Sequence, residues 1–259
     1  MSRRLAMGIR FINHWLHAVD EHSLHAPFIY KFYTQVIKNK VHNNSFAAVQ
    51  QLRSKLNQAR TPISYQDFGA GNQSVTSKTI GKISRTSHQP KVAHLLFSIA
   101  LRFKPGSILE LGTSLGLSTL CMASAAPEAS ITTLEGSQSL SQLANDHFEL
   151  LGATHIHSVV GNIDHTLDEV VNQLEVIDLL FMDANHQHQA TLTYFNKCLP
   201  KLHQHTIVVV DDIHWSHQME KAWEELIAHS KVTLSIDLFY AGVLFFKPDI
   251  TKSHVILSL

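Results

Sequence analysis

The stretch ILELGTSLGLST, residues 108–119, decides the fold. It begins with the apolar residues of a buried strand, passes through a turn that holds Gly112 and Gly116, and continues as the start of a helix. Glycine has no Cβ, so the backbone at these two positions could approach a ligand closely, and the N-terminus of the helix would present free N–H groups to it. The stretch therefore predicts a strand, a ligand-binding turn and a helix in one unit.

Short apolar runs alternate with helical segments after this unit, and they are rich in Ile, Leu and Val, as parallel strands covered on both faces are. The expected strands are Ser107–Leu111, Ser130–Leu134, His155–Val160, Ile177–Phe181 and Thr206–Val210, and the expected helices are Ser118–Ala125, Ser139–Leu151, Leu167–Asn172 and Ala190–Leu199. Two further runs, Val232–Phe239 and Val243–Lys247, lie close enough to form an antiparallel hairpin. The pattern predicts an α/β fold: a Rossmann-like, doubly wound, mostly parallel sheet with a C-terminal antiparallel hairpin.

The chain before this sheet has a different pattern. Residues 1–60 carry apolar residues at helical spacing, which predicts an N-terminal helical region. Residues 61–104 begin with Gly, Ser, Asn and Gln around Asp67-Phe68-Gly69-Ala70-Gly71, which is typical of a loop, and return to helical spacing from Lys91 to Phe103. We therefore divide the chain into a helical region at 1–60, a loop or lid with a helix at 61–104, and an α/β domain at 105–259.

The composition excludes several classes of protein. The 259 residues hold 21 Lys and Arg against 21 Asp and Glu, so the chain lacks the basic surface that nucleic acid or an anionic membrane would require. Cys121 and Cys198 lie far apart and fit reduced thiols, so we expect a cytoplasmic protein, with a homodimer as the one assembly to consider. The 19 histidines are scattered, and their number alone indicates no metal site.

The turn and the ends of the next two strands supply the expected contacts of a nucleotide-like ligand. Ser114 stands where a dinucleotide fingerprint has its second glycine, which disfavours a nicotinamide cofactor. Glu135 ends the second strand, where its carboxylate can accept hydrogen bonds from both hydroxyls of a ribose. Gly161-Asn162, after the third strand, is a candidate wall for an adenine ring, although Gly-Asn is also an ordinary turn.

Glu110, Gly112 and Gly116, with Glu135 one strand later, resemble the cofactor motifs of the class I S-adenosylmethionine-dependent methyltransferases. The terminal hairpin is similar to the end of that family's sheet. The resemblance covers roughly the last three-fifths of the chain, which is the predicted α/β domain. It implies S-adenosylmethionine as the cofactor and, as cofactor contacts, Glu110, Gly112, Thr113, Ser114, Gly116, Ser118, Glu135, Gly136, Gly161, Asn162 and Asp183.

Acidic residues follow the fourth and fifth strands. Asp183 and the pair Asp211-Asp212 resemble the metal-binding acids of the cation-dependent small-molecule O-methyltransferases, the catechol and macrocin O-methyltransferase-like groups. Asp212 departs from the catechol type, which has Asn there, and a second Asp suits the sugar O-methyltransferases. Adjacent strands would bring the three carboxylates together, and oxygen ligands favour a hard cation such as Mg²⁺. The alternative is that Asp183 and Asp211 cap the helices that follow them.

The resemblance implies methyl transfer to a hydroxyl of a small-molecule acceptor. We expect Asp183 to be catalytic together with His186 or His214, and His188 is a third histidine that could take the proton. The Asn/Asp-Pro-Pro-aromatic motif of amino-methyltransferases is absent after the fourth strand, which argues against methylation of a nucleic-acid base. Two other classes stay open: a non-catalytic S-adenosylmethionine-binding regulatory protein, and an oxidoreductase on the same fold.

Overall fold

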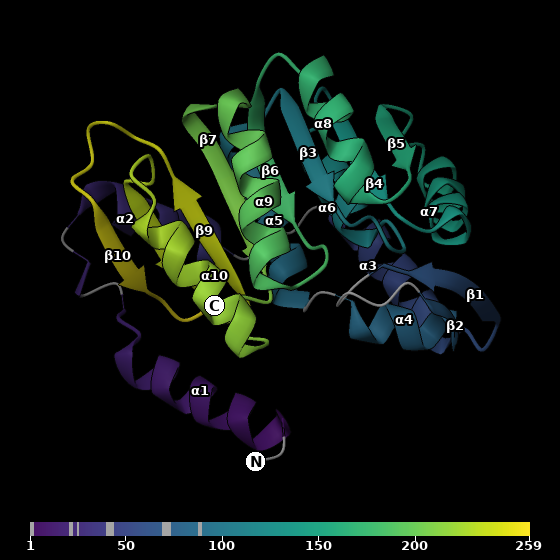
Figure 1. The fold of residues 1–259 in the computed structure, drawn as a ribbon, viewed down its shortest axis with the longest axis horizontal. Coiled ribbons are helices and arrows are strands. Elements are labelled where there is room, and N and C mark those ends of the chain that lie inside the picture. Colours follow the sequence, from purple (N-terminus) through teal and green to yellow (C-terminus); the bar gives the residue numbers. More distant parts are fainter. Residues whose placement is uncertain (1–2, 21–22, 25, 40–43, 69–73, 88–89) are drawn as a thin grey trace.

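The computed structural model describes residues 3–20, 23–24, 26–39, 44–68, 74–87 and 90–259. A central sheet carries helices on both faces (Figure 1). Its strands, in spatial order, are β10 (Ser253–Ile256), β8 (Leu234–Asp237), β9 (Ala241–Phe245), β7 (Leu202–Asp211), β6 (Ile177–Met182), β3 (Ser107–Leu111), β4 (Ser130–Glu135) and β5 (Ile156–Val160). Neighbouring strands are parallel except at β9, which is antiparallel to both β7 and β8. The predicted Rossmann-like fold with a C-terminal antiparallel hairpin is confirmed.

The sheet has an apolar core on each face because successive residues of a strand point to opposite sides. In β6, Leu179 and Phe181 lie in one core, and Leu180 and Met182 lie in the other. The first core is covered by α5 (Pro90–Phe103), α6 (Leu117–Ala125) and α7 (Gln138–Leu150), and the second by α8 (Ile163–Gln173), α9 (His188–Cys198) and α10 (His217–Ala228). A 3-10 turn, Leu199–Lys201, follows α9. Burial on both faces explains why these strands read as continuous apolar runs.

The N-terminal helices after α1 share the first core. α1 (Arg3–His17) is followed by α2 (Pro27–Phe32), a π-helical turn (Tyr33–Ile37) and α3 (Asn44–Gln58). Val36 of the π-helical turn and Phe46 of α3 are buried in this core, where the ring of Phe46 lies 4.6 Å from that of Phe97 in α5. The division of the chain at residue 105 stays a prediction, and this packing favours one folding unit. Among the described residues, no helix is long and apolar enough to cross a membrane.

Residues 61–86 differ from the expected loop. β1 (Pro62–Asp67) and β2 (Ser74–Thr79) pair as an antiparallel hairpin, and α4 (Ile80–Thr86) follows. The expectation of a loop before and after Gly69-Ala70-Gly71 is wrong for the described residues, because the two strands are polar and half of their residues are exposed, so they lack the apolar alternation that marks a half-buried strand. The Gly69-Ala70-Gly71 part of the expected lid lies outside the described residues.

Two C-terminal elements are missing from the sequence interpretation. α10 lies between β7 and β8, and β10 adds a parallel edge strand beside β8. β10 spans only Ser253–Ile256 and is half-exposed, so its sequence is too short and too mixed to read as a strand.

Candidate functional site

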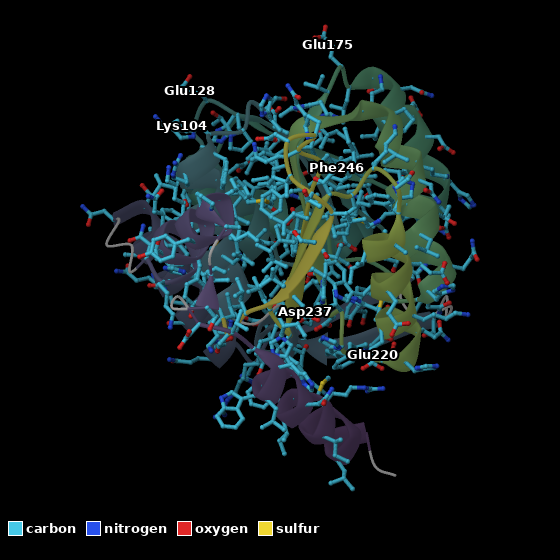
Figure 2. All side chains as sticks on the ribbon, turned by 90° about the vertical axis from the view of Figure 1, so that its left-hand side faces the viewer. Lys104, Glu128, Glu175, Glu220, Asp237 and Phe246 are labelled. Carbon is cyan, nitrogen blue, oxygen red and sulfur yellow. The ribbon has the colours of Figure 1, made fainter. Side chains whose placement is uncertain are left out.

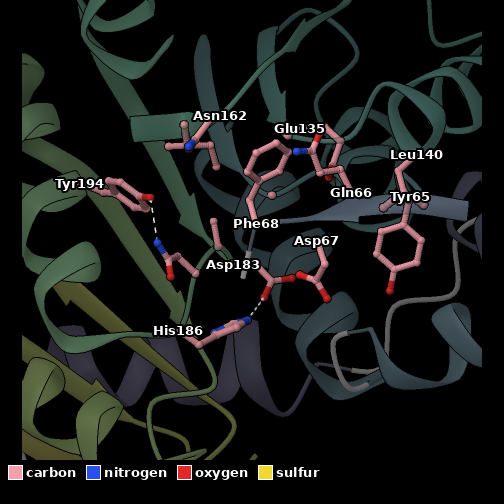
Figure 3. Close-up of a pocket in the computed structure, with 15 residues that line it drawn as sticks. Tyr65, Gln66, Asp67, Phe68, Glu135, Leu140, Asn162, Asp183, His186 and Tyr194 are labelled. Atoms are coloured by element: carbon pink, nitrogen blue, oxygen red, sulfur yellow. Dashed lines mark hydrogen bonds and ion pairs between the residues drawn. The ribbon is translucent and has the colours of Figure 1, made fainter. Parts of the chain in front are cut away.

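A cavity of about 220 Å³ lies at the carboxyl ends of the central strands (Figure 3). Its walls come from the end of β1 and from the turns after β3, β4, β5 and β6. The sheet order reverses between β3 and β6, which is where open α/β sheets bind their ligands. The lining residues are Tyr65, Gln66, Asp67, Phe68, Gly112, Glu135, Gly136, Leu140, Asn162, Ile163, Asp183, Ala184, Asn185, His186 and Tyr194.

Gly112 and Gly116 have different structural roles. Gly112 has a φ of +101°, and a Cβ there would stand 2.3 Å from the backbone oxygen of Asp183, so the turns after β3 and β6 touch through this residue. Gly116 has a φ of +73°, and a Cβ there would stand 2.5 Å from the ring of Phe148 in α7. Gly112 lines the cavity, whereas Gly116 is needed for helix packing and does not line it.

Glu135 is held in a fixed position at the end of β4. Its carboxylate accepts a hydrogen bond from the Ser114 N–H at 2.7 Å and another from the Ser137 N–H at 2.9 Å. Burial raises the pKa of Glu135, the backbone donors oppose that rise, and Asp67 across the cavity adds to it. Each carboxylate oxygen has a second lone pair, so Glu135 can accept further hydrogen bonds from a ligand.

Asp183 and Asp211 form a carboxyl pair beside the cavity. Asp183 follows β6 directly, Asp211 ends β7, and their side chains are hydrogen-bonded to each other, which requires a proton on one of them. Burial and the charges of Asp211 and Asp212 raise the pKa of Asp183 well above its ordinary value, and burial and Asp212 do the same for Asp211. Burial and the neighbouring charges therefore disfavour the ionised form of both carboxyls.

The three predicted metal ligands meet at one edge of the sheet without forming a ligand set. Among the residues that the structure describes, no group of three or more His, Cys, Asp or Glu side chains is arranged to hold a metal ion. Helix capping, the alternative role, is wrong for both Asp183 and Asp211, because Gln187 is the N-cap residue of α9 and Ser216 that of α10. Asn162, the predicted adenine wall, does cap a helix: its side chain accepts from the N–H of Asp164 in α8.

The turn after β6 places two polar side chains in the cavity wall. His186 Nε2 lies 3.4 Å from a carboxylate oxygen of Asp183, and burial lowers the pKa of His186, which Asp212 offsets in part. The imidazole is therefore neutral near pH 7 and can accept a proton. Asn185 donates from Nδ2 to the Tyr194 hydroxyl at 3.3 Å, while its Oδ1 is buried with no hydrogen-bond partner. Both residues have a positive φ, 65° for Asn185 and 34° for His186, which is typical of functional turns.

Comparison with known proteins identifies the domain that carries this cavity. Residues 109–213 match the family model of a methyltransferase domain. These residues are similar to a methyltransferase domain. The match includes the turns after β3, β4, β5 and β6, and therefore most of the cavity wall.

One curated relative and many solved structures resemble the chain. The O-methyltransferase hkm8 of Aspergillus hancockii is 29% identical over 143 residues, which cover 53% of this chain and 56% of that protein. The chain thus matches about half the length of this relative. The SAH-bound methyltransferase PaMTH1 of Podospora anserina has a TM-score of 0.61 at 16% identity, with 86% of this chain and 97% of that chain covered.

Two further structures give the same result. The O-methyltransferase of Bacillus cereus in complex with SAH has a TM-score of 0.57 at 16% identity, covering 84% of this chain and 97% of that chain. The O-methyltransferase TomG of Streptomyces achromogenes, involved in tomaymycin synthesis and in complex with SAM, has a TM-score of 0.57 at 18% identity, covering 83% and 94%. These structural matches establish the fold.

Several of the expected site residues do not line the cavity. Those that line it are Gly112, Glu135, Gly136, Asn162, Asp183 and His186, and those that do not are Glu110, Thr113, Ser114, Gly116, Ser118, Gly161, Asp211, Asp212 and His214. Their contacts are mostly supporting ones: the Thr113 hydroxyl bonds that of Thr133 at 2.6 Å, and the Gly161 N–H donates to the Glu135 carbonyl at 2.9 Å.

His214, an expected catalytic residue, faces α1 instead. Its Nε2 lies 2.8 Å from Asp237, and its ring stacks on Phe239 at 5.2 Å. Burial alone would lower the pKa of His214, but Asp237 and Glu220 outweigh this and raise it. The ring of His214 also meets that of His14 in α1 edge-on at 5.9 Å, so His214 lies between α1 and the C-terminal strands rather than in the cavity.

The end of β1, in the segment predicted as a loop or lid, contributes one wall of the cavity. Tyr65, Gln66, Asp67 and Phe68 line the cavity, and Phe68 lies so close to Gly136 that a Cβ on this glycine would stand 2.4 Å from its ring. Asp67 and Phe68 were expected in this loop or lid, whereas the strand that ends at Asp67, and Tyr65 and Gln66 as lining residues, were not predicted. Tyr194 likewise lines the cavity from α9, where its hydroxyl donates to Asp164 at 2.7 Å.

Glu110 is an internal anchor of the sheet. It is fully buried, one oxygen accepts from the hydroxyls of Thr119 and Thr133, the latter at 2.6 Å, and the other oxygen is buried with no hydrogen-bond partner. Burial raises the pKa of Glu110 to about 7 from an ordinary 4.5, although its hydroxyl donors act in the opposite direction.

We expect Glu110→Gln to change how stability depends on pH. Folding raises the carboxyl pKa, so between about pH 4.5 and pH 7 Glu110 is ionised in the unfolded chain but still protonated in the folded one. The folded state therefore loses stability as pH rises through this window. The glutamine variant lacks this cost, so its stability relative to wild type should rise by on the order of 3 kcal/mol across that window. Urea unfolding at several pH values measures the difference, and parallel curves for the two proteins would contradict a buried titrating Glu110.

Proposed function

We propose that the chain is an S-adenosylmethionine-dependent methyltransferase that methylates a hydroxyl of a small molecule. The observation that carries the proposal is the position of Glu135: a fixed carboxylate with free lone pairs, in the wall of a cavity at the switch point of the sheet, next to Gly112. A ribose offers two hydroxyl donors to such a carboxylate. The neutral charge balance and the three O-methyltransferases among the relatives and structures described above favour a small-molecule acceptor.

In this proposal each wall of the cavity has a task. Glu135 and the Gly112 turn hold the ribose of the cofactor. Phe68 and Gly136 enclose its adenine ring and exclude water. When bound, S-adenosylmethionine supplies a methyl group on a positively charged sulfur. His186 Nε2 accepts the proton of the acceptor hydroxyl as its oxygen forms a bond to the methyl carbon and the carbon–sulfur bond breaks.

A transfer assay with matched histidine variants tests this function. We expect label from methyl-labelled S-adenosylmethionine on a member of a panel of phenols, catechols and sugars, and a turnover loss of about 10²–10⁴-fold in His186→Ala with cofactor affinity unchanged. The control is His188→Ala, since His188 is bonded to Glu225 at 2.8 Å and does not line the cavity. S-adenosylhomocysteine binding without transfer to any acceptor would favour a regulatory binding protein, and nicotinamide binding an oxidoreductase.

Because the described residues hold no arranged ligand set, a divalent cation at Asp183, Asp211 and Asp212 is a prediction from the sequence resemblance alone. A cation would have to displace the proton that Asp183 and Asp211 share, so its binding should strengthen as pH rises. We expect millimolar Mg²⁺ or Mn²⁺ to raise the melting temperature of the wild type more at pH 8 than at pH 6, and Asp183→Asn to remove the increase. A melting temperature that does not respond to the cation, with full activity in chelator, would refute the metal site and leave the methyltransferase proposal intact.

A further inference from the structure

A second cavity, of about 340 Å³, lies on the face of the sheet that carries the first core. Its walls come from one side of α3 and from the N-terminal halves of α5 and α6. Figure 2 shows this side of the molecule at the left, where the labelled Lys104 and Glu128 lie beyond the ends of α5 and α6, and α10 with Glu220 at the right. The described residues that line the second cavity are all different from those that line the first, so the two cavities are separate.

The second cavity has an apolar floor and a polar rim. Five of its lining residues are buried in the first core: Phe46, Val49, Ala93, Leu117 and Cys121. Gln50 and Ser54, which also line it, are exposed on α3 and form the rim. Positions three and four apart share one face of a helix, so α3 contributes both floor and rim. A pocket of this kind buries the apolar part of a small molecule and fixes its polar part at the edge.

Arg53 of α3 brings a positive charge into the wall of the second cavity. Its guanidinium nitrogen Nη1 is buried, and burial lowers the pKa of the side chain, although a guanidinium stays protonated at neutral pH. The Cys121 thiol, which interacts electrostatically with Arg53, has its pKa raised by burial to about 12 and is therefore uncharged. Among the described lining residues, Arg53 is the one that is ionised at neutral pH, so the wall is positive. An anion in the cavity would offset the cost of burying this charge.

The charge and the size of the second cavity define the class of ligand. One guanidinium balances one negative charge, and its fork of N–H groups matches the two oxygens of a carboxylate. The volume lies near the lower end of the roughly 300–1,000 Å³ range of small-molecule sites, so the ligand is small. The buried floor, which includes the ring of Phe46, requires that the rest of the ligand be apolar. These requirements describe a monocarboxylic acid with an apolar chain or ring.

We propose that the second cavity is a binding site for a small apolar carboxylic acid, whose carboxylate binds Arg53 and whose apolar part lies on the floor between α3 and α6. The site goes beyond the proposed methyltransferase function and does not depend on it, because the two cavities are separate. It lies close to the proposed cofactor turn along the chain: Leu117 in its floor is the first residue of α6 and follows Gly116, the N-cap residue of that helix. We therefore expect the acid and the cofactor to bind at the same time.

Calorimetric titration with 4-phenylbutanoate and its neutral amide tests the ligand class. We expect the acid to bind the full chain with a dissociation constant on the order of 0.1–1 mM, as its size allows. The amide should bind roughly 10-fold more weakly or worse, because it forms no charge-assisted hydrogen bond with the guanidinium. Equal affinity for the acid and the amide, or binding of neither at about 10 mM, would overturn the proposal.

Matched substitutions on α3 test the role of Arg53. Arg53→Met removes the charge and keeps an unbranched side chain, so the affinity for 4-phenylbutanoate should fall by roughly 10–100-fold and the preference for the acid over the amide should disappear. The control is Lys55→Met: Lys55 is an exposed cation on the same helix and does not line the second cavity, so this change should leave the affinity as it is. An equal loss in both variants would show a non-specific attraction to α3 and overturn the site.

A variant of the floor tests the location without changing any charge. Ala93→Leu adds three carbon atoms to the floor of the second cavity, so it should weaken the acid and the amide alike. Saturating S-adenosylhomocysteine should leave the binding of 4-phenylbutanoate to the wild type unchanged. Unchanged affinity for the acid in a folded Ala93→Leu protein would overturn the site, and displacement of the acid by S-adenosylhomocysteine in that variant would assign it to the first cavity.

Discussion

Gly112→Ala is expected to abolish measurable cofactor binding. The new Cβ would stand 2.3 Å from the Asp183 carbonyl oxygen and 2.9 Å from its carbonyl carbon, both backbone atoms, and the residue would keep a φ of +101° that a side chain rarely adopts. The turns after β3 and β6 must therefore move apart, and these turns form the centre of the cavity wall. We expect affinity for S-adenosylhomocysteine, measured by calorimetric titration, to fall by more than about 100-fold.

The control separates backbone strain from the collision. Gly152 also has a positive φ, +69°, but a Cβ there would meet nothing within 4 Å. Gly152→Ala should lower stability by about 1–2 kcal/mol through strain alone and leave cofactor affinity unchanged. If Gly112→Ala lost no more affinity than Gly152→Ala, the contact between the two turns would be irrelevant to the site.

Glu135→Ala is expected to weaken cofactor binding by about 1.5–3 kcal/mol, the usual range for hydrogen bonds to a charged group. The substitution removes the proposed ribose acceptor and leaves the N–H groups of Ser114 and Ser137 without their present partner. Glu135→Gln should lose less, since it keeps one acceptor oxygen. Titration of folded variants with S-adenosylhomocysteine gives the loss, and an unchanged affinity would remove Glu135 from the cofactor site.

Asp178 provides the matched control for Glu135. Its carboxylate also accepts from two backbone N–H groups, those of Gly106 and Ser107 at 2.7 and 2.9 Å. These groups lie at the amino end of β3, whereas the cavity lies at the carboxyl ends of the strands. Asp178→Ala should lower the melting temperature without changing cofactor affinity. An equal loss of affinity in both variants would show that Glu135 acts through the stability of the sheet.

For the acidic residues after β6 and β7, the sequence predicts which side chains lie close together but not their protonation. Asp183 and Asp211 could be placed beside each other from the sequence, because residues that end adjacent parallel strands must meet. Their shared proton could not be predicted, since it depends on burial and on the distance between two side chains. The same limit applies to His214, which follows β7 as expected but is hydrogen-bonded to Asp237 rather than placed in the cavity.

The sequence by itself determined the sheet and the turn that opens the cavity. Runs buried on both faces, such as β3 and β6, carry their strand signal locally, and Gly112 is demanded by the backbone of its own turn. Only the tertiary structure decided that the end of the polar strand β1 lines the cavity and that Gly116 serves packing against Phe148. The physical reason is that burial patterns record whether a residue leaves water, whereas its partner across the fold is fixed by how all the elements pack together.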